Sequence, residues 1–181
     1  SITRLSTGVR AMYGGDAAGH SVGTLTNAHS KSYAQAARNI EDGISYAQAG
    51  EAVMLEVANL GIRLRELGIA DNNSALLDGN QTAALDAESN LVGDTIDKLV
   101  AQTAFNGTAV TGNVDSKVAY SRLNASVHEV GPAKAITAMG DTTDAANADT
   151  KADTLLAEVA ESLGNIAADL SALKAFQGAA S

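Results

Sequence analysis

The sequence predicts a mainly α-helical protein, an elongated rod of long antiparallel coiled-coil-like helices with a small β-hairpin region. The longest unbroken helical pattern covers residues 36–73 and contains no proline, because the only proline of the chain is Pro132. Apolar residues in this pattern recur every 3.5 residues on average, as in a coiled-coil seam; they are Val53, Val57, Leu60, Leu64 and Leu67. A helix from about His20 to Ala70 would span roughly 75 Å at ~1.5 Å per residue, which indicates a rod.

Two further helices are predicted to pack beside the long one. The second follows a loop of turn-forming residues at 71–80, has Thr82 as its candidate N-cap and runs to about Thr103. The third runs from Leu155 to about Phe176, and its apolar residues step by three and four. None of these helices can bury its apolar stripe alone, so we expect them to pack side by side.

The segments outside these helices carry weaker patterns. Ser1–Met12 predicts a short amphipathic helix, and the turn-forming sequence Tyr13–Asp16 separates it from the long helix. Residues 112–139 predict a small hairpin-rich region, with strands in VAYSRL and AITAM. Residues 141–153 are polar and acidic, and predict a linker.

Four glycines lie inside the pattern of the long helix, although each costs about 1 kcal/mol relative to alanine. They are Gly43, Gly50, Gly61 and Gly68. Their presence predicts either a close approach of neighbouring backbones or a less stable helix than the apolar period alone indicates.

Composition excludes several classes of function. The formal charge is −9, and the basic residues are scattered singly, which argues against a nucleic-acid-binding surface. The chain has no cysteine, so it has no disulfide, thiolate metal site or cysteine nucleophile. No run of 18 apolar residues and no charged-then-apolar leader is present, so we expect neither membrane insertion nor a cleavable signal.

No pattern in the sequence indicates catalysis, a cofactor or a metal, so we predict that the protein is not an enzyme. The three histidines, His20, His29 and His128, lack metal-ligand spacing, and no serine lies in a nucleophile elbow. Asp94 and Asp97 are interpreted as a solvated helix face, with Asp97 available for a local pair with Lys98.

One charged cluster on the long helix is singled out. It consists of Arg63, Arg65, Glu66 and Leu67, in which Arg63 and Leu67 are four residues apart and therefore lie on the same side. Without further information, the cluster is an ordinary helix surface with ion pairs inside the helix.

Five blocks of the sequence occur in the order of a known family. They are LSTGVR at residues 5–10, DAAG at 16–19, ARNIEDGISYAQAGE at 37–51, LRELGIADNN at 64–73 and TAFNG at 103–107. Together they resemble the N-terminal core of bacterial flagellins. The resemblance covers roughly the first 110 residues and implies a flagellin core-like fold.

The resemblance implies a structural subunit of the bacterial flagellar filament, extracellular and self-assembling through helical core contacts for motility. Its implied partners are other copies of itself and the Toll-like flagellin receptor of animals. The residues implied in subunit or receptor contacts are Arg63, Arg65, Glu66, Leu67 and Glu88. Val92 departs from an arginine that is common in the family, and Ile62 replaces a polar residue.

The resemblance also divides the chain into three parts. They are an N-terminal flagellin-like helical core at 1–111, a short variable β-hairpin and linker region at 112–150, and a C-terminal helix at 151–181 that completes the core. The family's terminal segments are expected to be missing, which predicts a monomer. The alternative function is a flagellin-like cell-surface protein that binds a polysaccharide or a host receptor.

Overall fold

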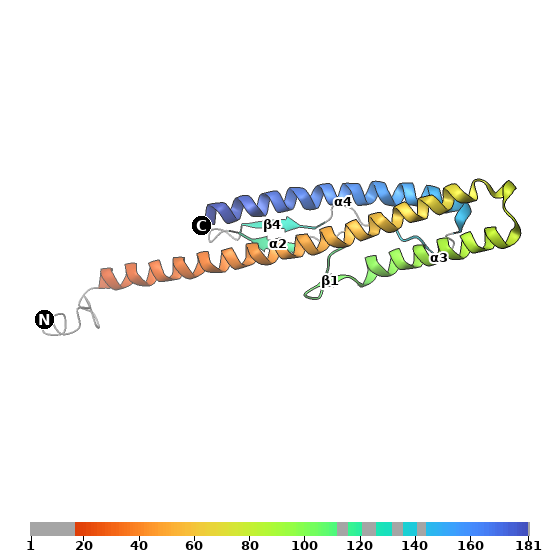
Figure 1. Cartoon of the computed structure of the whole chain (residues 1–181). Helices are drawn as coiled ribbons and strands as arrows, with labels where there is room; N and C mark the ends of the chain where they lie inside the picture. The colour runs from red at the N-terminus through yellow and green to blue at the C-terminus, as the bar shows by residue number, and fades with distance from the viewer. Residues whose placement is uncertain (1–16, 112–115, 121–125, 132–135, 141–143, 181) are drawn as a thin grey trace.

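The computed structural model describes residues 17–111, 116–120, 126–131, 136–140 and 144–180. Figure 1 shows a long rod built of three helices that lie side by side. The helix predicted at Ser1–Met12 and the turn predicted at Tyr13–Asp16 lie outside the described residues. The predicted class, a mainly helical rod with a small β region, is confirmed.

The helix α2 (Ala17–Asp71) is the longest element of the rod, and α4 (Ala145–Ala180) runs antiparallel along it. The 55 residues of α2 span about 82 Å at 1.5 Å per residue. The shorter helix α3 (Gly79–Gln102) returns beside α2 after the single 3₁₀ turn η1 (Ser74–Leu76). The apolar stripe predicted from the sequence lies in the core, where Val57, Leu64 and Leu67 are buried.

The glycines inside α2 mark where its neighbours come closest. A Cβ atom at Gly68 would collide with the backbone nitrogen of Asp149 on α4, and one at Gly50 would lie 3.3 Å from the carbonyl oxygen of Val110. The predicted close approach of backbones is therefore confirmed at these two positions.

The other two glycines face side chains instead of a neighbouring backbone. At Gly61 a Cβ atom would lie 3.1 Å from Leu155, and at Gly43 it would lie 2.7 Å from Val118. Gly43, near the middle of α2, also faces Leu173 late in α4, whereas Gly68 near the end of α2 faces Asp149 near the start of α4, as antiparallel packing requires.

The N-cap of α3 lies four residues before the predicted one. Asp78, not Thr82, is the N-cap: its carboxylate accepts hydrogen bonds from the backbone N–H groups of Asn80 and Gln81. The side chain of Gln81 accepts a hydrogen bond from the backbone N–H of Asp78 in return, which completes a capping box.

A short hairpin that the sequence interpretation missed follows α3. The strands β1 (Ala104–Phe105) and β2 (Thr108–Ala109) pair antiparallel. The two residues between them, Asn106 and Gly107, have φ angles of 50° and 80°, the positive values that a two-residue type I′ turn requires. The helix α3 itself ends at Gln102, close to the predicted end at about Thr103.

The predicted β-hairpin region contains the strands β3 (Ser116–Ala119) and β4 (Val127–Val130), which pair antiparallel. Val118 packs against α2 and α4, and the ring of Tyr120 stacks on Phe176 of α4 at a centroid distance of 4.0 Å. The AITAM segment was expected to be a strand, but its described residues 136–139 form neither strand nor helix.

Carboxylates from two helices hold the 136–140 segment, which explains its order without secondary structure. Glu158, which is buried, accepts hydrogen bonds from the backbone N–H and the hydroxyl of Thr137 at 2.8 and 2.7 Å. Asp97 accepts them from the backbone N–H groups of Met139 and Gly140 at 2.6 and 3.0 Å. The interpretation of Asp97 as part of a solvated face is therefore wrong.

The acidic linker predicted at 141–153 is also corrected, because α4 starts at Ala145 and includes residues 145–153. Asp86 of α3 accepts a hydrogen bond from the backbone N–H of Ala145 at 3.0 Å, and Asp144 accepts one from that of Asn147 at 3.1 Å. Carboxylates at a helix N-terminus satisfy free N–H groups and favour the helix dipole.

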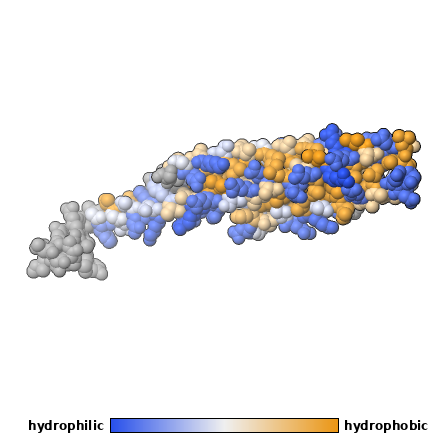
Figure 2. All heavy atoms as spheres, viewed as in Figure 1, coloured by the Kyte–Doolittle hydropathy of each residue, from blue (hydrophilic) through white to orange (hydrophobic). Residues whose placement is uncertain are grey.

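The first part of α2 extends beyond the end of α4 as a single helix (Figure 1). The side chains of residues 19–35 are exposed there, apart from the half-buried His29. Figure 2 shows hydrophobic residues gathered over the thicker part of the rod, whereas hydrophilic and intermediate residues dominate on the thin part. Among the described residues, no helix combines the length and hydropathy that crossing a membrane requires.

Candidate contact site

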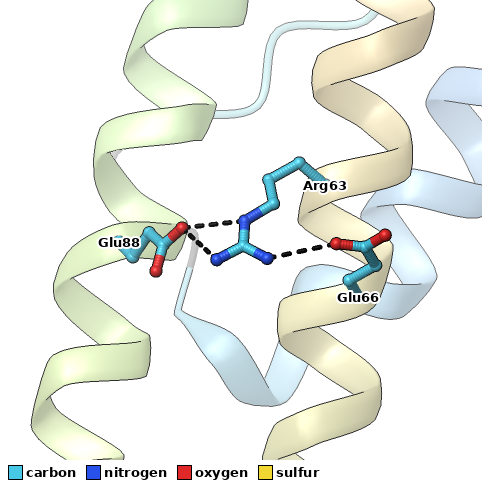
Figure 3. Close-up of polar contacts among 3 residues, drawn as sticks. All are labelled: Arg63, Glu66 and Glu88. Carbon is cyan, nitrogen blue, oxygen red and sulfur yellow. Dashed lines mark hydrogen bonds and ion pairs between the residues drawn. The ribbon is translucent and has the colours of Figure 1, made fainter.

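The predicted cluster forms a charged contact between α2 and α3. The guanidinium of Arg63 donates from Nε and Nη2 to Oε1 of Glu88 on α3, at 2.8 and 2.5 Å (Figure 3). Its third nitrogen, Nη1, donates to Oε2 of Glu66, one turn along α2, at 3.1 Å. Arg63 and Glu66, one turn apart on α2, are thereby brought together with the predicted contact residue Glu88, which lies 25 positions after Arg63.

The two carboxylates fix the charge of this cluster. The hydrogen bonds that Arg63 donates to Glu88, and then the one that it donates to Glu66, raise the pKa of Arg63 above its already high ordinary value. The guanidinium is therefore always charged, and the cluster carries one positive and two negative charges. About half of the Arg63 side chain and 60 % of that of Glu66 remain exposed, so a partner can reach both.

The other two predicted contact residues lie apart from this cluster. Nε of Arg65 lies 3.4 Å from a carboxylate oxygen of Asp153 on α4, and both side chains are more than half exposed. Leu67 is only 2 % exposed and belongs to the core. Its side chain is not accessible to a partner in this structure, so its position lends no support to the predicted contact.

An exposed row of apolar side chains runs beside the charged cluster, and sequence reasoning missed it. Leu55, Ile62 and Ile69 are about half exposed and follow one another at seven-residue steps on α2. We call these three residues the apolar row. The seven-residue spacing is present in the sequence, but it lies beside the more regular apolar stripe that forms the core, and only that stripe was interpreted.

The described residues offer no chemistry beyond surface contact at this site. They contain no group of three or more His, Cys, Asp or Glu side chains that could hold a metal ion. Nε2 of His128 lies 3.0 Å from Oδ1 of Asp169, far along the chain from the cluster. An exposed charged cluster beside an apolar row is the kind of surface that can bind another macromolecule.

Comparison with known proteins identifies the family. The pattern of the bacterial flagellin N-terminal helical region matches residues 1–113, more than half of the chain. The chain therefore belongs to the bacterial flagellin family, whose members are structural proteins.

Individual relatives agree with this assignment. A flagellin of Escherichia coli O127:H6 is 37 % identical over 111 residues, which are 61 % of this chain and 20 % of the relative. Flagellins of Xenorhabdus nematophila and Salmonella typhimurium are 38 % and 39 % identical over 114 residues, which cover 35 % and 22 % of those proteins. The matches thus span about a fifth to a third of the length of these relatives.

A solved structure shows the same fold. The crystal structure of Bacillus cereus flagellin matches with a TM-score of 0.66 at 22 % identity, covering 78 % of this chain and 88 % of that one. The fold similarity thus extends beyond the region of sequence similarity and takes in part of the chain after residue 113.

Proposed function

We propose that this chain is part of a structural subunit of the bacterial flagellar filament, which functions outside the cell in motility and not as an enzyme. The observation that carries the proposal is the family match over residues 1–113. The rod shape supports it, because a filament grows by laying elongated subunits against one another through repeated, non-closing contacts.

The apolar row and the charged cluster are proposed to bury themselves against another copy. Leu55, Ile62 and Ile69 expose about half of their surface although the bundle behind them is complete. Covering such a row removes apolar surface from water, which stabilises the contact by roughly 25 cal/mol for each Å² buried. The adjacent Arg63 and Glu66 would then set the register of the contact, because opposite charges must face each other across it.

Two matched measurements test the filament proposal. Peptides from residues 17–180 should be found by mass spectrometry in filaments sheared from the bacterium that carries the gene, and disrupting the gene should remove or shorten the filaments seen by electron microscopy. Unchanged filaments that lack these peptides would refute the proposal. Finding the protein only in the cell-surface fraction would instead favour the alternative function, a surface protein that binds polysaccharide or a host receptor.

The other expectations from the family resemblance are also kept as proposals. We propose that the Toll-like flagellin receptor of animals contacts the exposed Arg63, Arg65, Glu66 and Glu88. We also propose that the chain is divided into the three parts 1–111, 112–150 and 151–181. A receptor reporter assay tests the first: Arg63→Ala should lower the signal severalfold, whereas Lys174→Ala, on exposed α4 surface, should leave it unchanged. Equal signals from the two variants would refute the receptor contact.

A further inference from the structure

A groove lies away from the contact site, between α2, the β1–β2 hairpin and β3. It has a volume of about 380 Å³ and is open to solvent on one side. We call it the hairpin groove. It is lined by residues of α2, of the hairpin and of β3, namely Asn39, Asp42, Tyr46, Phe105, Asn106, Thr108, Ser116, Lys117, Val118 and Ala119.

One wall of the hairpin groove is the free edge of a strand. In the β3–β4 ladder, Tyr120 donates its backbone N–H to the carbonyl of Ser126, so alternate residues of β3 pair through hydrogen bonds with β4. Lys117 and Ala119 are the residues between these pairs, and their backbone groups therefore point outward. Of these groups, the carbonyl of Ala119 accepts a 3.4 Å bond from the side chain of Asn39.

The remaining outward groups have no partner in the described part of the chain. They are the N–H and C=O of Lys117 and the N–H of Ala119. Such a row of unpaired backbone groups is a template for another strand. The four consecutive β3 residues that line the groove make this template accessible from it.

A second part of the lining is aromatic and held in place. The ring of Tyr46 lies edge-on to that of Phe105 at a centroid distance of 6.3 Å, and its hydroxyl donates a 2.6 Å hydrogen bond to the carbonyl of Ala109. Tyr46 is buried, whereas Phe105 is 36 % exposed and offers its ring to the groove. An apolar side chain from an added strand can pack on this ring.

Among the residues that the structure describes, the charge in the groove that has no counter-ion nearby is negative. Asp42 is exposed, and its carboxylate has no hydrogen-bond or ion-pair partner among the described residues. The cation of the groove, Lys117, is instead matched by Glu129 of β4, whose carboxylate lies 3.7 Å away. A ligand with a basic side chain therefore complements the site, whereas a second copy of this chain, with a net charge of −9, is less suited.

We propose that the hairpin groove binds an extended peptide segment of another protein, which carries a lysine or arginine. The segment adds to the outer edge of β3 through its backbone and places the basic side chain at Asp42. Neighbouring apolar side chains of the segment pack on Phe105. This activity does not depend on filament assembly, because the groove and the apolar row involve different residues.

The probe is the pentapeptide Ac-TVKVT-NH2, titrated into the isotope-labelled chain and followed by NMR and calorimetry. We expect its addition to shift the amide signals of β3, of the β1–β2 hairpin and of α2 near Asp42. A peptide with glutamate in place of lysine should bind about tenfold more weakly, since a charge-assisted contact is lost. A peptide N-methylated at alternate residues should also lose at least about tenfold, because it cannot pair with the strand edge.

Variants of the protein separate the two parts of the proposal. Asp42→Asn should weaken the lysine peptide severalfold and abolish its preference over the glutamate peptide. Lys117→Pro removes an N–H that the β3–β4 ladder does not use, so the hairpin should persist while peptide affinity falls. Lys117→Ala is the matched control for the lost charge, and Asp153→Asn is the control for a carboxylate outside the groove.

Three results would overturn the proposal. The first is equal binding of the N-methylated and unmodified peptides, and the second is full affinity in Lys117→Pro. The third is that none of the peptides shifts the amide signals of the groove, whereas the neutral disaccharide cellobiose does, which would make the groove a sugar site.

Discussion

Several acidic side chains of this chain act as acceptors for backbone N–H groups. Asp86, Asp97 and Glu158 hold the segment that leads into α4, and Asp169 accepts a 3.1 Å hydrogen bond from the backbone N–H of Gly131 beside β4. Irregular backbone must satisfy its polar groups, and these carboxylates do so where no ladder is available. Part of the net negative charge therefore stabilises the fold.

Asp97→Ala tests this role. Because it leaves two backbone N–H groups without their charged acceptor, we expect it to lower the free energy of unfolding by about 1.5–3 kcal/mol. Urea unfolding followed by circular dichroism measures the loss. Asp94→Ala, an exposed aspartate on the same helix, should change it by less than about 0.5 kcal/mol; similar losses in the two variants would contradict the assignment.

The contact between Arg63 and Glu88 should contribute little to stability despite its short distances. Both side chains are more than 40 % exposed, and exposed ion pairs are worth about 0.2–1 kcal/mol. A double-mutant cycle with Arg63→Ala and Glu88→Ala measures this coupling, which should shrink further in high salt. A coupling well above 1 kcal/mol would show that the pair mainly stabilises the packing of α3 against α2, and would argue against its being available to a binding partner.

At the scale of the elements, α2 and α4 approach each other because glycine leaves room. Gly68→Ala would push a methyl group into the backbone of Asp149, so we expect a loss of about 1–3 kcal/mol in the free energy of unfolding. Gly164→Ala is the matched control, because a Cβ atom there meets nothing within 4 Å. It should stabilise α4 by about 0.5–1 kcal/mol, and thermal unfolding should show the two changes with opposite signs.

The elements differ in how far the sequence predicts them. The interiors of the three long helices follow from apolar steps of three and four, because each helix buries one stripe. The start of α4 does not, since the N–H of Ala145 is bonded by Asp86, a residue 59 positions earlier. The β1–β2 hairpin could have been predicted, because an Asn-Gly pair is a strong local signal for such a turn.

The candidate site was predictable only in part. The sequence placed Arg63 and Glu66 on one helix, and the family resemblance added Glu88, but their meeting depends on how α3 packs against α2. Leu67 was assigned to the site although its own step in the apolar stripe already indicated the core. The hairpin groove joins residues 39–46 of α2 to the β1–β2 hairpin and β3, which follow them more than 50 residues later, so no local pattern could indicate it.

At the scale of the whole molecule, the rod has one part in which α2 packs against other elements and one part in which it does not. Residues 19–35 of α2 carry exposed side chains such as Val22 and Leu25, whereas from Ala36 onward one face of the helix is buried. Isolated helices of this length are marginal in water. We expect amides before Ala36 to exchange with solvent at least 100-fold faster than those around Met54, as measured by hydrogen-exchange mass spectrometry; equal protection would contradict the observed packing.

The single-helix part of α2 also has a mechanical consequence. Resistance to bending rises steeply with thickness, and the rod narrows from a packed bundle to one helix near Ala36. Thermal bending should therefore concentrate in the single-helix part, so that the bundle swings as a stiff arm on a compliant stem. Any neighbour that packs along the stem would remove this compliance and fix the direction in which the arm points.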